Sequence, residues 1–305
     1  MKPCDKCKKK AVTFIRYSGM HLCKGHLNDF FERRVKRVLR RQCNLGKDEV
    51  LAIAISGGKD SVVTMHMLHE ILGNRKDLEM HAITVDEGIS NYRPKSVESA
   101  KKNCLILGID HHITSFKDII GFTMDEIAEL PIETTPCSYC GVFRRKCLNL
   151  KAKELGATML ATGLNLDDTA QSIVMNFMRG DIAKLARLGP HNRIQEGLVP
   201  RIQPLRLIPE KESYLFAMLN NIEFYGGECP YSERALRGKY RDIINNLEKD
   251  TPGTRHAILQ SSDSIADALI KSFPPAKLIK CIECGEPTLN MLCKSCRMVR
   301  ELDDM

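Results

Sequence analysis

Residues 56–61 read Ser-Gly-Gly-Lys-Asp-Ser and lie between the apolar runs 50–55 and 62–65. The pattern predicts a buried strand that passes through a glycine turn into a helix, because glycine adopts backbone conformations closed to residues with a Cβ. Backbone NH groups of such a turn, with those of the first helical turn, can point at one anion. The lysine adds a charge and the serines add two hydroxyls. We therefore predict that this segment holds the phosphates of a nucleotide.

The loop differs from a Walker A motif, which requires Gly-x-x-x-x-Gly-Lys-Ser/Thr. Here Gly57 and Gly58 are adjacent, and Lys59 precedes Asp60. This order indicates a nucleotide that is cut at a different bond. The run resembles the SGGxDS loop of the PP-loop ATP pyrophosphatases, which adenylate a carbonyl oxygen and release pyrophosphate. The alternative is a tight strand-to-helix turn without a ligand.

Cysteine pairs at both ends of the chain have the spacing of zinc ligands. Cys4-x2-Cys7 and Cys23-x2-His26 supply a Cys3His set, and Cys281-x2-Cys284 and Cys293-x2-Cys296 supply a Cys4 set. Four protein ligands complete a tetrahedron, so both sites are expected to be structural. Zinc also explains how short terminal segments can fold, because metal binding contributes folding free energy. The alternative is a redox-active dithiol at each end.

A third cysteine pair, Cys137 and Cys140, has no second pair nearby in the sequence. Cys229, in the segment Gly-Gly-Glu-Cys-Pro, is the candidate partner because a glycine-flanked loop can present a ligand. Three thiolates favour an iron–sulfur cluster with one iron that has no protein ligand. A thioredoxin-like CxxC, a mononuclear site and unconnected cysteines remain alternatives on spacing alone.

Strands are predicted to alternate with helices in the middle of the chain, which indicates a doubly wound parallel α/β sheet. Ligands bind beyond the carboxyl ends of such strands, so residues 56–61, 85–88 and 162–168 should share one pocket. Asp167 and Asp168 open a helix at this edge and can hold Mg2+ on a polyphosphate; the alternative is that an Asp at this helix start is an N-cap. The predicted strands are 50–55, 80–85, 111–114 and 159–164, and the predicted helices are 60–72, 95–107, 142–155, 168–179 and 211–221.

The bulk composition fits a globular protein of the cytoplasm. The chain has 305 residues, 43% of them hydrophobic, and a formal charge of +8. No run is apolar enough for a membrane span and the N-terminal residues do not resemble a signal peptide, so thirteen cysteines favour metal or catalytic sulfur over disulfides. The expected domains are an N-terminal finger (1–27), a basic linker helix (28–48), a catalytic domain (49–250), a linker (251–276) and a C-terminal finger (277–305).

Basic residues crowd into the linker helix, and a polyanion is a plausible partner for them. A solvated helix face is the alternative, since apolar residues follow helical spacing on the other side. A second basic stretch covers 234–241. The nucleic-acid contacts expected on the helix are Arg33, Arg34, Lys36, Arg37, Arg40 and Arg41.

The order of these motifs resembles the tRNA 2-thiouridine synthetases of the TtuA/NcsA group, a resemblance that covers nearly the whole chain. It implies a [4Fe-4S] cluster on Cys137, Cys140 and Cys229, which can lose its uncovered iron and leave a [3Fe-4S] form. It further implies ATP on the glycine loop, with a basic residue after the CxxC, here Arg144, in the pocket; relatives can have lysine there. The residues that the resemblance assigns to ATP are Ser56, Gly57, Gly58, Lys59, Asp60, Ser61, Thr84, Val85, Arg144, Gly163 and Asp168.

The implied reaction adenylates the C2 oxygen of a tRNA uridine and then replaces it with sulfur, without a redox step. Lys59, the loop amides and Mg2+ would stabilise the departing pyrophosphate. The resemblance also implies a homodimer and a sulfur source that is sulfide or a thiocarboxylated ubiquitin-like carrier. The residues expected to act in catalysis are Lys59, Asp60, Cys137, Cys140, Asp168 and Cys229.

Three rival functions follow from the same motifs. The first is thiolation of the T-loop uridine, which is linked with heat-loving organisms. We favour the wobble uridine, because thirteen Met and thirteen Cys are unlike the composition of a hyperthermophile's protein. Thiolation of a tRNA cytidine is the second rival, although the two zinc modules argue against it. The third is a zinc-finger RNA-binding protein whose nucleotide loop has no activity.

Overall fold

A parallel five-stranded sheet forms the centre of the computed structural model, which describes residues 2–43, 45–188, 195–232 and 237–305. The strand order is β5-β4-β3-β6-β7 and every neighbouring pair is parallel. The predicted fold class is therefore confirmed. Within the described ranges, no helix is long and apolar enough to cross a membrane. The strands are β3 (Glu49–Ala54), β4 (Leu78–Asp86), β5 (Asp110–Ser115), β6 (Met159–Ala161) and β7 (Arg201–Ile202).

Helices cover both faces of the sheet, which explains why the central strand β3 is continuously apolar after Glu49. Leu51 and Ile53 of β3 point into a core formed with α1 (Lys24–Gln42), α2 (Lys59–Leu72), α3 (Arg93–Leu107) and α9 (Glu210–Leu219). Ala52 and Ile83 point to the opposite core, formed with α4 (Phe116–Ile120), α5 (Met124–Glu129) and α6 (Pro136–Glu154). The sheet edge that carries the loop after β3 is thereby held between two packed layers.

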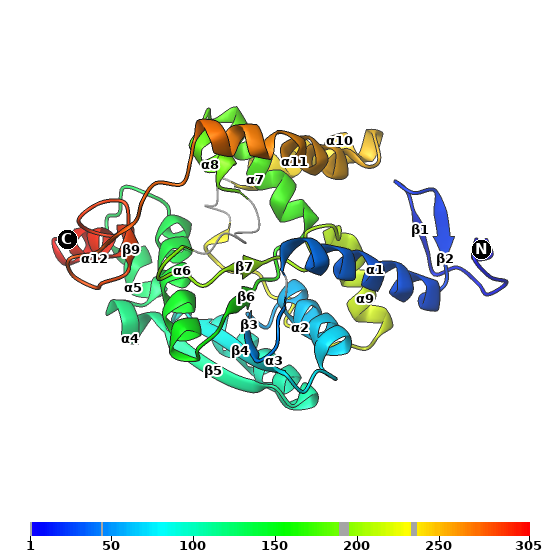
Figure 1. Cartoon of the computed structure of the whole chain (residues 1–305), viewed down its shortest axis with the longest axis horizontal. Coiled ribbons are helices and arrows are strands. Elements are labelled where there is room, and N and C mark those ends of the chain that lie inside the picture. The colour runs from blue at the N-terminus through cyan, green and yellow to red at the C-terminus, as the bar shows by residue number, and fades with distance from the viewer. Residues whose placement is uncertain (1, 44, 189–194, 233–236) are drawn as a thin grey trace.

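A further helical layer lies above the sheet in Figure 1. It contains α7 (Leu166–Met178), α8 (Ile182–Ala186), α10 (Arg237–Asp250) and α11 (Thr254–Ser272). Leu166 and Ile173 of α7 bury Leu259 of α11. The segment 251–276, expected to be a linker, is thus helical over most of its length and packs on α7.

The two cysteine-rich modules lie at opposite ends of the molecule (Figure 1). The N-terminal module has the hairpin β1 (Thr13–Ile15) and β2 (Met20–Leu22) and packs against Leu215 and Leu219 of α9. The C-terminal module has β8 (Ile279–Lys280), β9 (Pro287–Thr288) and α12 (Lys294–Asp303). Its Met298 and Leu302 enter the core on the α6 side of the sheet. Both modules are therefore docked on the central domain.

Two element boundaries and one short strand differ most clearly from the prediction. Helix α6 begins at Pro136, not near residue 142, because proline is tolerated in the first helical turn and Thr135 before it is extended. Strand β6 ends at Ala161, and the following residues form the turn before α7. The short strand β7 was not predicted, since two residues carry no periodicity.

Candidate functional site

Gly57 is required by the backbone of the loop that follows β3. Its φ is +82°, and a Cβ there would lie 1.8 Å from the carbonyl oxygen of Ser96 on α3. The Gly57 carbonyl accepts a hydrogen bond of 2.9 Å from the backbone NH of Tyr225. The loop is thus clamped between α3 and the segment that follows α9.

Hydroxyl groups and a second glycine fix the rest of the loop. Ser61 Oγ donates to the Gly58 carbonyl at 2.8 Å, and the backbone NH of Ser56 donates to Ser61 Oγ at 3.1 Å. A Cβ on Gly163, in the turn after β6, would lie 2.8 Å from the Ser61 backbone nitrogen. Only glycine lets the third predicted segment approach the loop so closely.

An open cavity of about 520 Å³ lies over this loop, at the carboxyl ends of β3, β4 and β6. The predicted residues that line it come from all three segments that the sequence assigned to one pocket, so their meeting is confirmed by the geometry. The cavity walls include Ser56, Gly58, Lys59, Asp60, Ser61, Val85, Arg144 and Gly163.

Three predicted ATP residues do not line this cavity. Gly57 shapes the loop from below, as its contact with Ser96 shows. Thr84 is fully buried, with its hydroxyl donating to the Ile55 carbonyl at 2.8 Å. Asp168 is separated from the cavity by Arg237. Arg237 lines the cavity, and its Nη1 lies 3.2 Å from Asp168 Oδ1.

A buried carboxylate organises the wall opposite the loop. Glu87 is 1% exposed and pairs with Arg93 and Arg144, each at 2.8 Å from an Nε atom. Arg93 Nη1 also donates to the Ser56 carbonyl at 3.2 Å, which ties the glycine loop to the end of β4. Glu87 raises the pKa of Arg144, so this guanidinium is held in its charged form.

Arg144 connects this charge cluster to the middle cysteines. Its Nη2 lies 3.1 Å from Cys140 Sγ, one helical turn earlier on α6. Cys137 Sγ donates to the Tyr231 carbonyl at 3.4 Å, which brings the Cys229 loop against the start of α6. Burial raises the pKa of Cys140 to about 11, and the charges of Cys137 and Cys229 act in the same direction. The three predicted cysteines therefore gather at one place beside the nucleotide cavity.

The arrangement of these three sulfurs suits a cluster better than a single ion. Among the described residues, the sets whose ligand atoms all lie within 4.8 Å of one another are the two terminal ones. Cys137, Cys140 and Cys229 are half-buried and more widely spaced than such a set. Three thiolates that each bind a different iron need this wider spacing, so the donor set fits an iron–sulfur cluster.

Carboxylates gather on the opposite side of the cavity, around Lys59. Lys59 Nζ contacts Asp60 Oδ2 at 2.8 Å and Glu210 Oε1 at 3.4 Å. The other oxygen of Asp60 is buried without a hydrogen-bond partner in the described part of the chain. Burial raises the pKa of Asp168, and the nearby charges of Asp60 and Glu210 raise it further while Arg237 lowers it. These groups can offer oxygen ligands to a hard cation.

Asp167 does not share that role. It pairs with Arg255 of α11 at 2.6 Å and accepts the backbone NH of Glu210 at 2.8 Å. The predicted pair of carboxylates is thus divided: Asp167 joins helices, and Asp168 faces the cavity through Arg237. The N-cap of α7 is Asn165, not an Asp, and Asp168 is the third helical residue, whose side chain accepts the backbone NH of Asn165 in a capping box.

The terminal cysteine sets have the geometry expected of structural metal sites. Cys4 Sγ and Cys23 Sγ lie 3.3 and 3.4 Å from His26 Nδ1, and Cys7 Sγ lies 3.7 Å from Cys23 Sγ. In the other module, Cys284 Sγ and Cys293 Sγ are 3.6 Å apart, and the backbone NH of Cys293 donates to Cys281 Sγ at 3.2 Å. The four ligands of each set, Cys4, Cys7, Cys23 and His26, and Cys281, Cys284, Cys293 and Cys296, can each hold one ion.

The basic helix α1 carries one residue that cannot contact a nucleic acid. Arg34 is 7% exposed, pairs with Glu212 of α9 and donates to Tyr17 Oη at 2.6 Å. It therefore holds the N-terminal module to the central domain. The prediction that Arg34 contacts tRNA is wrong. The other five basic residues of the set are exposed: Arg33, Lys36, Arg37, Arg40 and Arg41. Arg234 of the second basic stretch lies outside the described residues.

Several residues of the cavity were not found from the sequence. Glu87 stands in a segment that was assigned to the pocket, but nothing in one sequence shows that it is buried between two arginines. Arg93 and Arg237 appear in the sequence as ordinary charges at helix starts. Arg145 and Arg201 also line the cavity. Their role depends on tertiary contacts that no local pattern encodes.

The fold and the glycine loop define a PP-loop protein. A family model described as "PP-loop domain" matches residues 27–247. Residues 4–28 match a second model, described as "2-thiouridine synthetase TtuA, N-terminal LIM domain".

Known relatives agree along nearly the full length. The chain is 37% identical over 317 aligned residues to the tRNA 2-thiolation protein NcsA of Haloferax volcanii, covering 98% of this chain and 99% of that protein. It is 32% identical to the tRNA-5-methyluridine(54) 2-sulfurtransferase of Pyrococcus horikoshii (96% and 92% covered) and 34% identical to the cytoplasmic tRNA 2-thiolation protein 1 of Caenorhabditis elegans (99% and 81%). Among solved structures, the U34-tRNA thiolase NcsA of Methanococcus maripaludis, with its [4Fe-4S] cluster, superposes with a TM-score of 0.86 at 35% identity (99% and 97%).

This chain belongs to the tRNA 2-thiolation family of PP-loop proteins, as the order of its motifs indicated.

Proposed function

We propose that the protein is an ATP-dependent tRNA uridine 2-sulfurtransferase in which the glycine loop holds ATP and Cys137, Cys140 and Cys229 hold a [4Fe-4S] cluster. The observation that carries the proposal is the shared wall: Arg144 lines the nucleotide cavity and also contacts Cys140 Sγ at 3.1 Å. An activated base in the cavity would therefore lie next to the sulfur-handling site. The relatives' names support the same reaction.

The first half-reaction joins the C2 oxygen of the uridine to the α-phosphorus of ATP and breaks the bond to pyrophosphate. Gly58 and Lys59 line the cavity at the start of α2, so the phosphates are proposed to bind the free backbone NH groups of the first turn of this helix, and Lys59 supplies a positive charge. Arg93 contributes by keeping the Ser56 carbonyl in place. These groups stabilise charge that accumulates on the leaving pyrophosphate.

Mg2+ is expected at the carboxylate side of the cavity. Asp60 has a buried oxygen without a partner, and Asp168 lies nearby, so both fit a cation that also binds phosphate oxygens. When bound, the cation neutralises charge on the triphosphate.

The second half-reaction forms the C2–S bond and breaks the bond between C2 and the AMP oxygen. Neither C2 nor the sulfur changes oxidation state. When bound, the cluster supplies an iron that has no protein ligand and can carry the incoming sulfur. Arg144 contributes a charge between the two sites, and Glu87 fixes its position. Sulfide, or the thiocarboxylate of a ubiquitin-like carrier, is the proposed sulfur source.

The two terminal modules are proposed to hold one structural zinc ion each. All four positions of each set come from the protein, so neither ion has an open coordination site for chemistry. Residues 1–27 and 277–305 are the proposed bounds of the two modules, and the exposed basic residues of α1 are proposed to contact tRNA phosphates. We further propose a cytoplasmic protein that acts as a homodimer, with exposed Ile243 and Leu247 of α10 available to a second copy.

The wobble uridine is the proposed target. The superposed thiolase is named for U34, whereas the Pyrococcus relative is named for position 54. Mapping the thiolated nucleotide by mass spectrometry after nuclease digestion separates the two, and product at a cytidine would identify the cytidine rival instead.

An anaerobic turnover experiment tests the proposed activity. Reconstituted protein is incubated with unmodified tRNA, sulfide and α-labelled ATP, and AMP and 2-thiouridine are counted. We expect one AMP per 2-thiouridine, with product lost in Cys229→Ala and retained in Cys43→Ala, whose sulfur lies just after the end of α1 and away from the cavity. Tight tRNA binding without AMP release would instead identify an RNA-binding protein without catalysis.

A further inference from the structure

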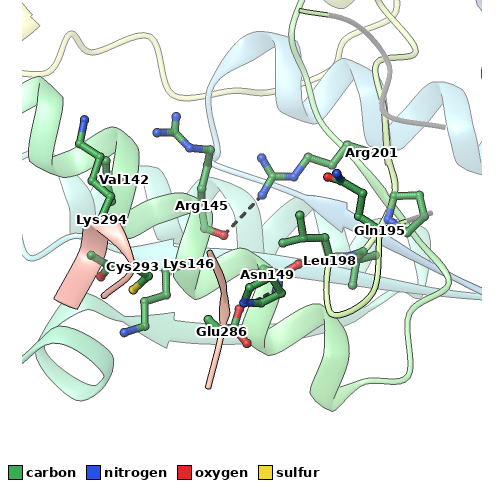
Figure 2. Close-up of a pocket in the computed structure, with 14 residues that line it drawn as sticks. Val142, Arg145, Lys146, Asn149, Gln195, Leu198, Arg201, Glu286, Cys293 and Lys294 are labelled. Atoms are coloured by element: carbon green, nitrogen blue, oxygen red, sulfur yellow. Dashed lines mark hydrogen bonds between the residues drawn. The ribbon is translucent and has the colours of Figure 1, made fainter. Parts of the chain in front are cut away.

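A second cavity, of about 340 Å³, lies between α6, the segment 195–201 and the C-terminal module. Figure 2 shows its lining side chains. Arg145 and Arg201 belong both to this cavity and to the wall of the nucleotide cavity. The two spaces therefore meet at a pair of arginines.

These cations have no acidic partner in the described residues. The acid in this cavity, Glu286, is already engaged by Lys153 at 2.8 Å and by Asn149 at 2.8 Å. Arg201 Nη2 donates to the backbone carbonyl of Arg145 at 3.4 Å, which brings the Arg201 guanidinium against the part of α6 that carries Arg145 (Figure 2). Burial and the charge of Arg145 lower the pKa of Arg201 to about 10. The pair is thus arranged at a cost that a bound anion would offset.

The C-terminal module adds two further groups that suit an anion. Lys294 lines the cavity at the start of α12, where the helix dipole is positive. Ser295 is 4% exposed, also lines the cavity, and its hydroxyl has no hydrogen-bond partner among the residues described. Four cationic side chains line this cavity, Arg145, Lys146, Arg201 and Lys294, and an unpaired buried hydroxyl in the same cavity indicates a ligand with oxygen atoms of its own.

We propose that Arg145, Arg201 and Lys294 hold a phosphodiester of the substrate tRNA next to the uridine that enters the nucleotide cavity. The inference rests on the proposed function and names a contact that the family's motifs do not. A base can reach a cavity below the surface only if its backbone is held at the entrance, and planar guanidinium groups match phosphate oxygens in pairs. Because the module that contributes Lys294 is docked on α6, Lys294 is held on the same cavity as Arg145.

The same anion chemistry could come from ATP or its pyrophosphate, and the two sources are separable by measuring both affinities. We expect Arg201→Gln and Arg145→Gln each to weaken tRNA binding at least about tenfold, the effect of losing a charged hydrogen bond. The dependence of log K on log salt should become less steep by about 0.7–0.9 per lost contact. The affinity for ATP without tRNA should fall by much less than the affinity for tRNA.

Matched variants complete the experiment. Lys102→Gln on α3 is the control, because it removes one positive charge that is exposed and already paired with Glu223. It should leave tRNA affinity unchanged. Arg201→Lys should restore part of the affinity, because it keeps the charge and loses the planar fork. Arg145 is exposed, so its variant is expected to fold even where Arg201→Gln does not.

The possible results are distinct. Unchanged tRNA affinity in both glutamine variants would overturn the inference while leaving the proposed function intact, provided that the wild-type protein binds and thiolates tRNA. An equal loss of ATP affinity would also overturn it and assign the arginines to the triphosphate. Wild-type protein that neither binds nor thiolates tRNA would refute the proposed function itself.

Discussion

Alanine substitution of the two adjacent glycines of the loop should affect different properties: protein stability at Gly57 and ATP affinity at Gly58. Gly57 has a φ of +82° and no room for a Cβ, which would lie 1.8 Å from a backbone oxygen of α3. Gly58 has a φ of −78° and a ψ of 160°, values open to any residue, and the nearest atom to a Cβ there is Ser56 Oγ at 3.4 Å. Gly58, however, lines the nucleotide cavity, whereas Gly57 does not.

The magnitudes follow from these contacts. A left-handed alanine costs about 1–2 kcal/mol and overpacking about 1–3 kcal/mol, so Gly57→Ala should lose at least about 2–5 kcal/mol of stability. For a domain of this size, this lowers Tm by roughly 5–15 °C. Gly58→Ala should change stability by no more than about 1 kcal/mol, the difference expected at a helix N-cap. A Cβ in the phosphate cradle should instead weaken ATP binding by about tenfold or more.

Thermal unfolding and calorimetric ATP titration of both variants provide the assay. Gly25→Ala is the control, because a Cβ at that exposed helical position meets no atom within 4 Å. The reasoning is refuted if Gly57→Ala keeps the wild-type Tm, or if Gly58→Ala binds ATP as tightly as wild type.

Three further perturbations test other parts of the structure. Glu87→Gln should leave two guanidinium groups next to an uncharged side chain and lower the free energy of unfolding, measured in urea, by about 3–5 kcal/mol. The control Glu154→Gln breaks an exposed pair with Lys151 and should cost less than about 1 kcal/mol. Similar losses in both variants would contradict the buried-charge argument. Burial lowers the pKa of His111 from 6.5 to about 4 in the folded state, so the unfolded chain takes up a proton at higher pH and stability should fall as pH decreases from 6.5 to 4. His111→Gln should reduce that fall in stability. An identical pH dependence in the variant would contradict the assignment to His111. Cys281→Ser should remove one of two zinc ions and raise proteolysis of residues 277–305 without releasing the second ion, whereas loss of both would show that the modules are coupled.

The sequence contained most of the chemistry because that chemistry is local. The run 56–61 needs its glycines at fixed neighbouring positions, and the terminal cysteine pairs need two-residue spacers, so both signals survive in a single sequence. The strand–helix alternation predicted the sheet and placed three segments at one edge, as the cavity confirms.

The remaining features depend on contacts between distant segments. Arg34 has the spacing of an exposed base, and only Glu212, 178 residues later, shows why it is buried. The role of Glu87 depends on Arg144 of α6, and that of Arg201 depends on a two-residue strand. Asp167 and Asp168 are neighbours in sequence, but they face different elements because helical residues one apart point in different directions.

The measurement that tests the central claim most directly is the content of iron, acid-labile sulfide and zinc in protein purified without oxygen, compared with Cys229→Ala and with the control Cys43→Ala. The account predicts about two zinc and three to four iron per chain in the wild type and the control, and a loss of iron and sulfide but not zinc in Cys229→Ala. Two zinc with neither iron nor sulfide in the wild-type protein would contradict it.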